Sequence, residues 1–430
     1  METAKRITGQ VEISEDIIVE VQKEVKHIPS FKEYVEKSLD KNTTELLGVI
    51  LFGAINLNAS DIHLEPEENQ VQLRVRIDGI LQDVLEMDTK IYTGVLARIK
   101  LLSKLKLNVG DRPQDGRFSI VLRSEEIEIR TSILPAEYGE SIVLRILNPK
   151  SLISLEQLGL RKDLDDLFKK ELAKPNGMII VTGPTGSGKT TTLYAFLKKI
   201  HHPEIKIITL EDPIEYHLEG ISQTQVDAKK GYDFASGLRS IMRQDPDVIL
   251  VGEIRDLETA STALQASLTG HLVFTTLHTN DAAGTIARLQ ALGEKPINIS
   301  PAVNLAIAQR LVRRVCKKCA VFEKPSSEEL NIIKKVLKGV PEMYYSNIDK
   351  IPKAKGCDIC NNTGYSGRVS IFEALQIDDE IEKLILTSPS IIALRELAIK
   401  KGMITMRQDG FIKVIEGVTT IDEVDRVTEA

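Results

Sequence analysis

The sequence predicts an α/β protein whose core is a mostly parallel sheet, with an N-terminal α+β domain before it and a cysteine-bearing insert and a helical region after it. The first observation is a series of short apolar runs bounded by glycine, proline or charge, such as GMIIVTG, IKIITLEDP, DVILVGE and GHLVFTTLH. Helical stretches such as TTTLYAFLKKIH and LETASTALQASLTG alternate with these runs. Strands that alternate with helices in this way indicate a parallel sheet covered on both faces.

Size and composition narrow the class of protein. A chain of 430 residues is too long for one compact core, so two or three domains are expected. The net charge of −6 argues against a surface that coats nucleic acid, although a local basic groove stays compatible with it. No apolar stretch approaches the ~18–20 residues of a membrane span. The N-terminus has no signal-peptide pattern, so we expect a cytoplasmic protein with reduced thiols.

Domain boundaries are expected where the character of the chain changes. In QVQLRVRIDG, apolar residues alternate with Gln and Arg, which predicts a half-buried strand of the α+β domain. The stretch NPKSLISLEQLG has the proline and serine typical of a linker. The expected divisions are an N-terminal arm (1–40), the α+β domain (41–148), a linker (149–159), the α/β core (160–312), the cysteine-bearing insert (313–370) and a C-terminal helical region (371–430).

The stretch GPTGSGKT predicts a phosphate-binding loop. A buried strand precedes it and a helix follows, which is the context that the motif requires. Its glycines let backbone N–H groups converge on phosphate oxygens, Lys189 reaches the β- and γ-phosphates of ATP, and the Thr190 hydroxyl binds Mg²⁺. The expected nucleotide-binding residues form the loop and the start of the helix: Gly183, Pro184, Thr185, Gly186, Ser187, Gly188, Lys189, Thr190 and Thr191.

Two glutamates end neighbouring strands of the predicted sheet. Glu253 follows DVILVG, and Glu211 ends the run ITLE. Ligands of a parallel sheet bind at the carboxyl ends of its strands, so both carboxylates are candidates to flank the γ-phosphate. One would hold Mg²⁺, while the other orients or deprotonates the attacking water. The alternative for each is a structural glutamate that caps a helix or forms a salt bridge.

Two histidines bracket the run GHLVFTTLH. His271 precedes its apolar residues and His278 follows them. A histidine near a strand end is more often structural than catalytic, but a γ-phosphate sensor needs a polar group on this neighbouring strand. Both histidines are therefore catalytic candidates.

All four cysteines lie in two C-x-x-C pairs, which are Cys316 with Cys319 and Cys357 with Cys360. In a reducing compartment two such pairs indicate a tetrahedral structural Zn²⁺ site. The interval between the pairs is longer than in many zinc ribbons, so disulfides or unligated thiols are the alternatives. A site with four cysteine ligands leaves no open coordination position and is not expected to be catalytic.

From about Leu46 to Arg426 the chain resembles the secretion ATPases that power type II secretion and type IV pilus assembly. The matching segments are ASDIHLEP, RVRIDG, RPQDGRFS, GPTGSGKTTTLY, ITLEDPIEY, RQDPDVILVGEIRD, TGHLVFTTLHTNDAAGTIARL and AQRLVRRVC. The resemblance implies a RecA-like P-loop core and a PAS-like N-terminal domain. It also implies that Glu253 holds the Walker B position and with it Mg²⁺. Glu211 would be the catalytic glutamate of the Asp box, and His271 and His278 would belong to the His box.

The resemblance further implies a hexameric ring in which arginine fingers come from the N-terminal domain. Arg76 and Arg98 fall on the matching stretches, with Arg112 and Arg117 nearby. From the residues alone, Arg76 fits a solvated strand arginine equally well. The expected partners are an inner-membrane platform protein and a cytoplasmic or membrane docking protein, so any membrane association would come through partners. The cysteine insert favours export or pilus extension over pilus retraction.

Two other functions are compatible with a RecA-like core. A nucleic-acid translocase would need basic loops and aromatic stacking platforms. The sequence has no basic–aromatic cluster, so direct nucleic-acid binding is not expected. A nucleotide-gated scaffold, which binds ATP but hydrolyses little of it, is the third possibility.

Overall fold

The computed structural model describes residues 9–122, 125–149, 152–346 and 348–429, which divide into two compact units. Unit 1 runs from the N-terminus to Ser151 and includes two short later segments, Cys316–Cys319 and Lys355–Ser366. Unit 2 holds the rest of the chain. Within the described ranges, no helix combines the length and the apolar character that a membrane crossing needs.

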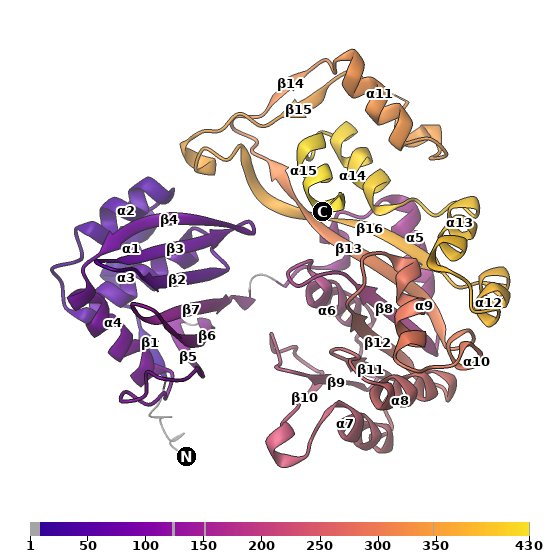
Figure 1. Ribbon diagram of the computed structural model, residues 1–430, viewed down its shortest axis with the longest axis horizontal. Coiled ribbons are helices and arrows are strands. Elements are labelled where there is room, and N and C mark those ends of the chain that lie inside the picture. The colour runs from indigo at the N-terminus through magenta and orange to yellow at the C-terminus, as the bar shows by residue number, and fades with distance from the viewer. Residues whose placement is uncertain (1–8, 123–124, 150–151, 347, 430) are drawn as a thin grey trace. The chain divides into compact units, whose positions relative to one another are not determined.

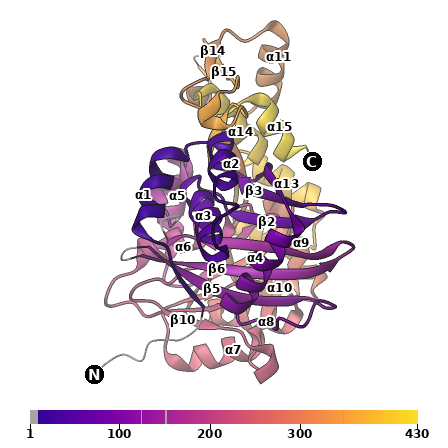
Figure 2. The same ribbon diagram turned by 90° about the vertical axis from the view of Figure 1, so that its left-hand side faces the viewer.

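Unit 1 is a seven-stranded sheet with helices packed on one face, as Figure 2 shows with α1–α4 in front of the strands. The strand order is β1-β5-β6-β7-β2-β3-β4, and only the pairing of β1 with β5 is parallel. The elements are β1 (Gln10–Glu12), α1 (Glu15–Glu24), α2 (Ile28–Glu36), α3 (Thr43–Asn56), β2 (Asp61–Pro66), β3 (Val71–Ile77), β4 (Ile80–Met87), α4 (Thr89–Leu102), β5 (Gln114–Leu122), β6 (Glu125–Ala136) and β7 (Gly139–Leu147). The α+β prediction for this region is confirmed.

The N-terminal arm predicted for residues 1–40 is corrected by the structure from Gly9 onward; residues 1–8 lie outside the described ranges. Strand β1 joins the sheet edge, and Val21 and Phe31 are fully buried against α3 and its neighbours. Helices α1 and α2 have only 10 and 9 residues, so they depend on tertiary packing. Their short apolar patterns, interrupted by charges, resemble those of a solvated segment.

Unit 2 is built on a second seven-stranded sheet, ordered β10-β9-β11-β12-β8-β13-β16 (Figure 1). In this order, each pair of neighbouring strands from β10 through β9, β11, β12 and β8 to β13 is parallel. The strands are β8 (Gly177–Thr182), β9 (Ile207–Glu211), β10 (Ser222–Gln225), β11 (Val248–Val251), β12 (Leu272–Leu277), β13 (Val303–Val315) and β16 (Tyr365–Gln376), with β14 (Val321–Glu323) and β15 (Ile351–Lys353) forming a separate hairpin. The helices are α5 (Lys162–Leu172), α6 (Lys189–Ile200), α7 (Phe234–Ile241), α8 (Leu257–Leu268), α9 (Ala282–Ala291), α10 (Pro296–Ile299), α11 (Ser327–Val336), α12 (Asp379–Leu386), α13 (Ile391–Lys400), α14 (Met406–Ile415) and α15 (Ile421–Thr428).

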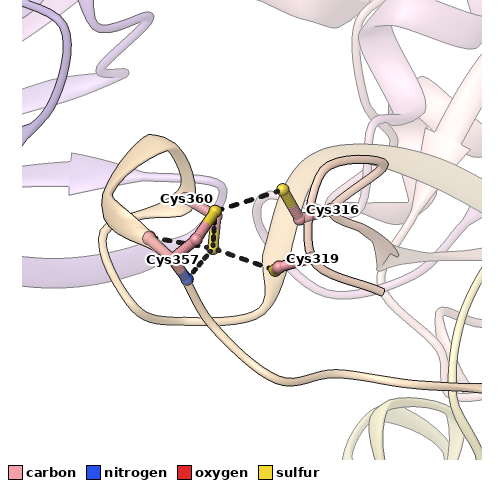
Figure 3. A group of neighbouring side chains, drawn as sticks. All are labelled: Cys316, Cys319, Cys357 and Cys360. Carbon is pink, nitrogen blue, oxygen red and sulfur yellow. Dashed lines mark hydrogen bonds between the residues drawn. The ribbon is translucent and has the colours of Figure 1, made fainter. Parts of the chain in front are cut away.

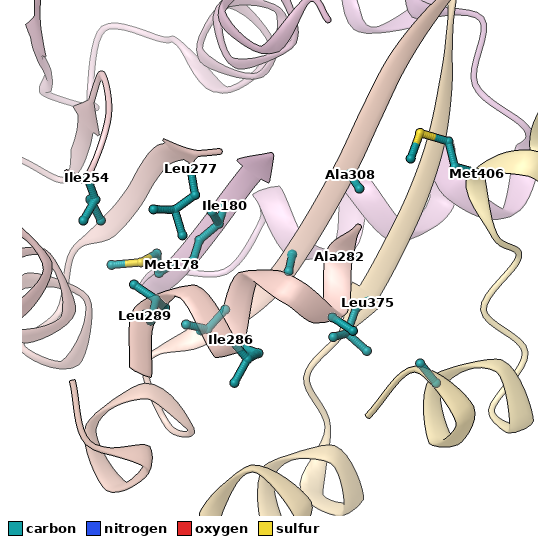
Figure 4. Close-up of a cluster of buried hydrophobic side chains, with 14 of the residues drawn as sticks. Met178, Ile180, Ile254, Leu277, Ala282, Ile286, Leu289, Ala308, Leu375 and Met406 are labelled. Atoms are coloured by element: carbon teal, nitrogen blue, oxygen red, sulfur yellow. The ribbon is translucent and has the colours of Figure 1, made fainter. Parts of the chain in front are cut away.

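The central strand β8 shows why this sheet is covered on both faces. All six of its residues are buried. Met178 and Ile180 face the apolar cluster that includes α9, where Ile286 and Leu289 pack (Figure 4). The intervening residues face a second cluster formed with α5 and α6. Two apolar layers therefore hold the strand, and its carboxyl end delivers the phosphate loop at a fixed point.

Three predicted boundaries shift in unit 2. Leu155 and Leu158, placed in the linker by the sequence, form a short 3-10 turn and are buried in the core. Strand β13 continues to Val315 and β16 begins at Tyr365, so the insert spans the residues between these strands rather than 313–370. The region predicted as helical from 371 begins inside β16. The sequence did not predict the full lengths of β13 and β16. These strands are neighbours in the sheet although the insert separates them in the chain, so no local pattern shows where β16 begins.

Candidate active site and metal centre

The loop between β8 and α6 has the backbone of a phosphate cradle. Gly183, Gly186 and Gly188 have φ angles of 147°, 79° and 88°, a region that favours glycine. A Cβ atom on Gly183 would lie 2.6 Å from the Gln309 carbonyl oxygen, whereas a Cβ on Gly186 would meet nothing within 4 Å. The loop is therefore packed against β13 on one side and open at its tip.

Polar groups of the loop fit a phosphate ligand. Among the described residues, the Ser187 hydroxyl is buried and has no hydrogen-bond partner. Lys189 Nζ donates to the carbonyl oxygens of Gly183 at 2.9 Å and Pro184 at 3.0 Å. Burial, above all, lowers the pKa of Lys189 to about 8, and the Arg310 guanidinium adds to this effect. Thr190 is half-buried in the first turn of α6, where helix N–H groups favour an anion.

Glu253 and His278 come together at the carboxyl edge of the sheet. Glu253 lies two residues beyond β11, its Oε2 is 3.7 Å from His278 Nε2, and its other oxygen pairs with Arg255. Its charge also raises the pKa of Lys189. Burial and the Lys189 ammonium lower the pKa of His278, so the ring is neutral near pH 7. The structure thus brings a lysine, a carboxylate and a neutral imidazole to one edge.

Glu211 is close in the fold but its side chain is enclosed. It ends β9 beside β11, and only 3% of the residue is exposed. Its carboxylate accepts hydrogen bonds from the Tyr194 hydroxyl, from Thr209 Oγ1 at 2.6 Å and from Gln223 Nε2 at 3.1 Å. Tyr194 belongs to α6, so Glu211 fastens the helix of the phosphate loop to β9. In this arrangement the carboxylate is a positioning group rather than a free base.

The structure does not bring His271 to the site. This residue precedes β12, and its Nδ1 lies 2.9 Å from the Ala266 carbonyl oxygen at the end of α8. Its own carbonyl accepts from Gly177, the first residue of β8. The six residues of β12 lie between His271 and His278, so the two are seven residue steps, or about 23 Å, apart. The prediction of a catalytic role for His271 is therefore corrected: it caps a helix at the opposite edge of the sheet.

The candidate arginine fingers lie in unit 1. Arg76, near the end of β3, is 3.6 Å from Asp61 and donates to the Gly79 carbonyl oxygen at 3.2 Å. Asp61 is buried and also binds Arg145 at 3.1 Å, so the segment SDIHLE holds two arginines. Arg98 lies in α4, and its buried Nε has no hydrogen-bond partner among the residues that the structure describes.

Of the two further arginines named from the sequence, both are exposed. Arg112 lies 3.3 Å from the neighbouring carboxylate of Asp111. Arg117 lies 3.9 Å from Glu128 on the adjacent strand. The side chains of both arginines are 70% exposed.

The four cysteines converge on one point, as Figure 3 shows. Their sulfur atoms all lie within 4.8 Å of one another, with separations of 3.7, 3.8 and 4.0 Å for three of the pairs. Four thiolates around one Zn²⁺ at about 2.3 Å would be about 3.8 Å apart, whereas a disulfide needs about 2.0 Å. The thiols are free. The residues therefore fit a tetrahedral Zn²⁺ site.

The turn around the second cysteine pair supports a thiolate. Burial raises the pKa of Cys360, but backbone N–H groups of Cys357 and Gly364 outweigh burial and lower that pKa to about 7. Burial raises the pKa of the neighbouring Cys319 to about 12, so Cys360 is the thiol that this turn favours as a thiolate. Asn361, in the same turn, accepts the backbone N–H of Ile28 at 2.6 Å. The cysteine turn is thereby hydrogen-bonded to the start of α2 within unit 1.

Three charged residues at the site were missed from the sequence. Asp212 is exposed next to the enclosed Glu211, and its charge acts on Arg255. Arg255 pairs with Glu253. Arg310 lies beside Gly183. Asp212 and Arg255 stand just after strands in the quoted segments ITLEDPIEY and RQDPDVILVGEIRD, so position alone could have indicated them. Arg310 also stands in a quoted segment, AQRLVRRVC, but it lies inside a strand, and only the pairing of β13 with β8 brings it to the loop.

Comparison with known proteins gives a consistent set of relatives. Residues 36–426 match the family described as type II/IV secretion system protein. The type IV pilus assembly ATPase PilB of Thermus thermophilus is 42% identical over 422 residues, which cover 98% of this chain and 46% of that protein. The type II secretion system protein E of Pseudomonas aeruginosa is 44% identical over 402 residues, covering 93% and 78%. The chain thus spans about half the length of the Thermus relative.

Solved structures agree on the fold. The X-ray structure of the Legionella pneumophila ATPase DotB aligns with a TM-score of 0.64 at 24% identity, over 89% of this chain and 94% of that one. The crystal structure of the pilus retraction motor PilT with bound ADP aligns with a TM-score of 0.60 at 27% identity, over 89% and 96%. The predicted P-loop core with an N-terminal α+β domain is therefore confirmed at the level of the fold.

Proposed function

Because the chain belongs to the type II/IV secretion system protein family, we propose that it is an ATP-hydrolysing motor that drives type II protein secretion or type IV pilus assembly. The observation that carries the proposal is the convergence of Lys189, Glu253 and His278 at the carboxyl edge of a parallel sheet, beside a glycine cradle. This edge is where parallel sheets bind their ligands.

Each residue of this edge has a task in hydrolysis. Backbone N–H groups of the loop bind the phosphates, and Lys189 neutralises the charge that spreads over the transferring phosphoryl oxygens. Thr190 and Glu253 would hold Mg²⁺, which supplies further positive charge when bound. The carboxylate of Glu253, with 18% of its side chain exposed, would also orient the attacking water. His278, kept neutral, can donate a hydrogen bond to the terminal phosphate without adding charge.

Glu211 contributes from behind the site. Its three hydrogen-bond donors come from α6, β9 and β10, so the carboxylate sets where the helix of the phosphate loop begins. A shift of that helix would move the loop N–H groups relative to the phosphates. Glu211 is therefore expected to affect turnover through geometry, as a positioning residue.

The working form proposed here is a homo-hexamer. In a ring, Arg76 and Arg98 of unit 1 would act as arginine fingers toward a nucleotide, a role that can contribute roughly 10³–10⁵ in rate. The proposed partners are a platform protein of the inner membrane and a docking protein, with membrane attachment through them. Relatives of 42% and 44% identity are a pilus assembly ATPase and a type II secretion protein, which favours export or extension.

The cysteine cluster is proposed to bind Zn²⁺ in a structural role. The four sulfur atoms have the spacing of a closed tetrahedral site. Zinc bound there would rigidify the turn that is hydrogen-bonded to the start of α2. No chemical step is assigned to it.

Steady-state ATP hydrolysis by the purified chain tests the proposal. Replacement Glu253→Gln should lower turnover by roughly 10²-fold or more and leave ATP binding intact. Glu204→Gln is the matched control because its side chain is 91% exposed. Equal, near-zero turnover of the wild type and Glu253→Gln would contradict the motor and favour a scaffold. Stimulation of hydrolysis by DNA would instead favour the translocase.

A further inference from the structure

Arg310 lies directly beside the phosphate loop. Strand β13 pairs in parallel with β8, with Ala308 opposite Thr182, so the next two residues run past the end of β8 along the loop. A Cβ atom on Gly183 would lie 3.2 Å from Arg310 Nη1. The guanidinium group is thus in contact with the first glycine of the loop.

The hydrogen bonds of Arg310 hold its orientation and leave its charge unneutralised. Nη1 donates to the Gln309 carbonyl oxygen at 3.1 Å, and Nη2 donates to the Asn280 carbonyl oxygen at 3.2 Å. Asn280 follows His278 by two residues, so the guanidinium bridges the phosphate loop and the loop after β12. A guanidinium group has five N–H donors, and these two hydrogen bonds use only two of them. The remaining donors are available to an anion at the same edge.

The acidic groups around Arg310 do not pair with it. Of the residues that the structure describes, none places a carboxylate at ion-pair distance, and the attraction from Glu373 and Asp281 acts at longer range. Glu373 instead accepts the backbone N–H groups of Ala282 at 3.1 Å and Met406 at 3.2 Å. Its carboxylate is occupied in capping two helices.

A second cation stands close to the first. The charges of Arg310 and Lys189 act on each other at this half-buried position. Two like charges in a partly desolvated place are unfavourable. Glu253 offsets part of the Lys189 charge, and an anion shared between the two cations would offset the rest. A triphosphate in the cradle would be such an anion, and the lysine of this motif reaches the β- and γ-phosphates.

We propose that Arg310 is a further phosphate-binding residue, supplied by the same chain as the loop, and that it discriminates ATP from ADP by binding the terminal phosphate. The inference rests on the proposed function, since it needs ATP in the cradle. The contact that distinguishes ATP from ADP would then come from β13 of the same chain, and the arginine fingers proposed in unit 1 would act in addition to it.

Equilibrium binding of a non-hydrolysable ATP analogue and of ADP to the full chain, with Mg²⁺ present, tests this role. Arg310→Gln should weaken binding of the analogue by about tenfold or more, the size expected for one charge-assisted hydrogen bond, and ADP binding by less than about threefold. Arg310→Lys should recover part of the loss, and it carries the test if the glutamine variant does not fold. The control is Arg314→Gln on the same strand, whose Nε donates to the Arg368 carbonyl oxygen at 3.2 Å.

The ratio of the two affinities decides the outcome. If Arg310→Gln weakens the analogue and ADP by the same factor, or changes neither, Arg310 only holds the two loops together and the inference is overturned. Lys189→Ala separates this failure from a failure of the proposed function. If Lys189→Ala also leaves both affinities unchanged, the loop does not bind nucleotide; if it abolishes binding, only the role of Arg310 is lost.

Discussion

Replacement of Glu423 by glutamine should destabilise unit 2 at neutral pH. Glu423 lies in the first turn of α15 and is 1% exposed. Its carboxylate accepts the Arg313 backbone N–H at 3.0 Å, Arg313 Nη2 at 2.7 Å and Arg426 Nε at 2.8 Å. These bonds fasten the last helix to β13, the strand that also carries Arg310. A neutral glutamine cannot satisfy both guanidinium groups.

The magnitude follows from the pKa of this carboxyl group. Burial raises that pKa, but the arginines outweigh burial and bring it from 4.5 to about 2. The lowering from 4.5 to about 2 corresponds to about 3 kcal/mol of folding free energy. Because the folded-state pKa is the lower one, this contribution is complete above about pH 4.5 and is lost as the pH falls toward 2. At pH 3 less than half of this contribution should remain.

Urea denaturation followed by circular dichroism at pH 7 and pH 3 measures the effect. Glu423→Gln should lose about 3 kcal/mol relative to the wild type at pH 7 and clearly less at pH 3. Glu429→Gln is the control: this residue pairs with Arg407 at 2.6 Å with 55% of its side chain exposed, so a loss of about 0–1 kcal/mol is expected. An equal loss for both variants, or a loss at pH 3 as large as at pH 7, would refute the reasoning.

Three further predictions concern the metal centre and the active site. The purified chain should contain zinc by elemental analysis, and Cys360→Ser should reduce this content and lower the melting temperature by roughly 5 °C or more. Because the pKa of His278 is lowered, any acid limb of the ATPase rate that depends on it should lie below pH 6.5 and disappear in His278→Asn. Tyr194→Phe removes a donor to the buried Glu211 and should cost about 1–3 kcal/mol in chemical denaturation, with a lower turnover number; unchanged values of both would contradict the positioning role.

The core sheet could be predicted from sequence because its signals are local. Apolar runs such as Met178–Val181 are buried on both faces, so they read as continuous hydrophobic strands. The N-terminal helices could not be predicted in this way. Val21 and Phe31 become buried only through α3, which supplies the apolar surface that short helices lack. The end of the insert could not be predicted either, because β16 becomes part of the sheet only through its pairing with β13, which lies before the insert in the chain.

The candidate site divides along the same line. The sequence could not show which of His271 and His278 lies near the phosphates, because they stand at the two ends of one apolar run. A strand displaces successive residues by about 3.3 Å, so only one end of β12 can reach the phosphate edge. Glu211 was expected as an open carboxylate, but Tyr194, Thr209 and Gln223 approach it from three elements and enclose it.

The sequence by itself determined the phosphate loop and the cysteine pairs, because closely spaced residues impose both the backbone path of a glycine cradle and the turn of a C-x-x-C pair. Only the tertiary structure decided which charged groups share the site with Lys189. Arg310 is 121 positions away in the chain and reaches Gly183 because β13 and β8 are hydrogen-bonded neighbours. Strand order, a long-range property that no local pattern encodes, selects the chemistry at the carboxyl edge.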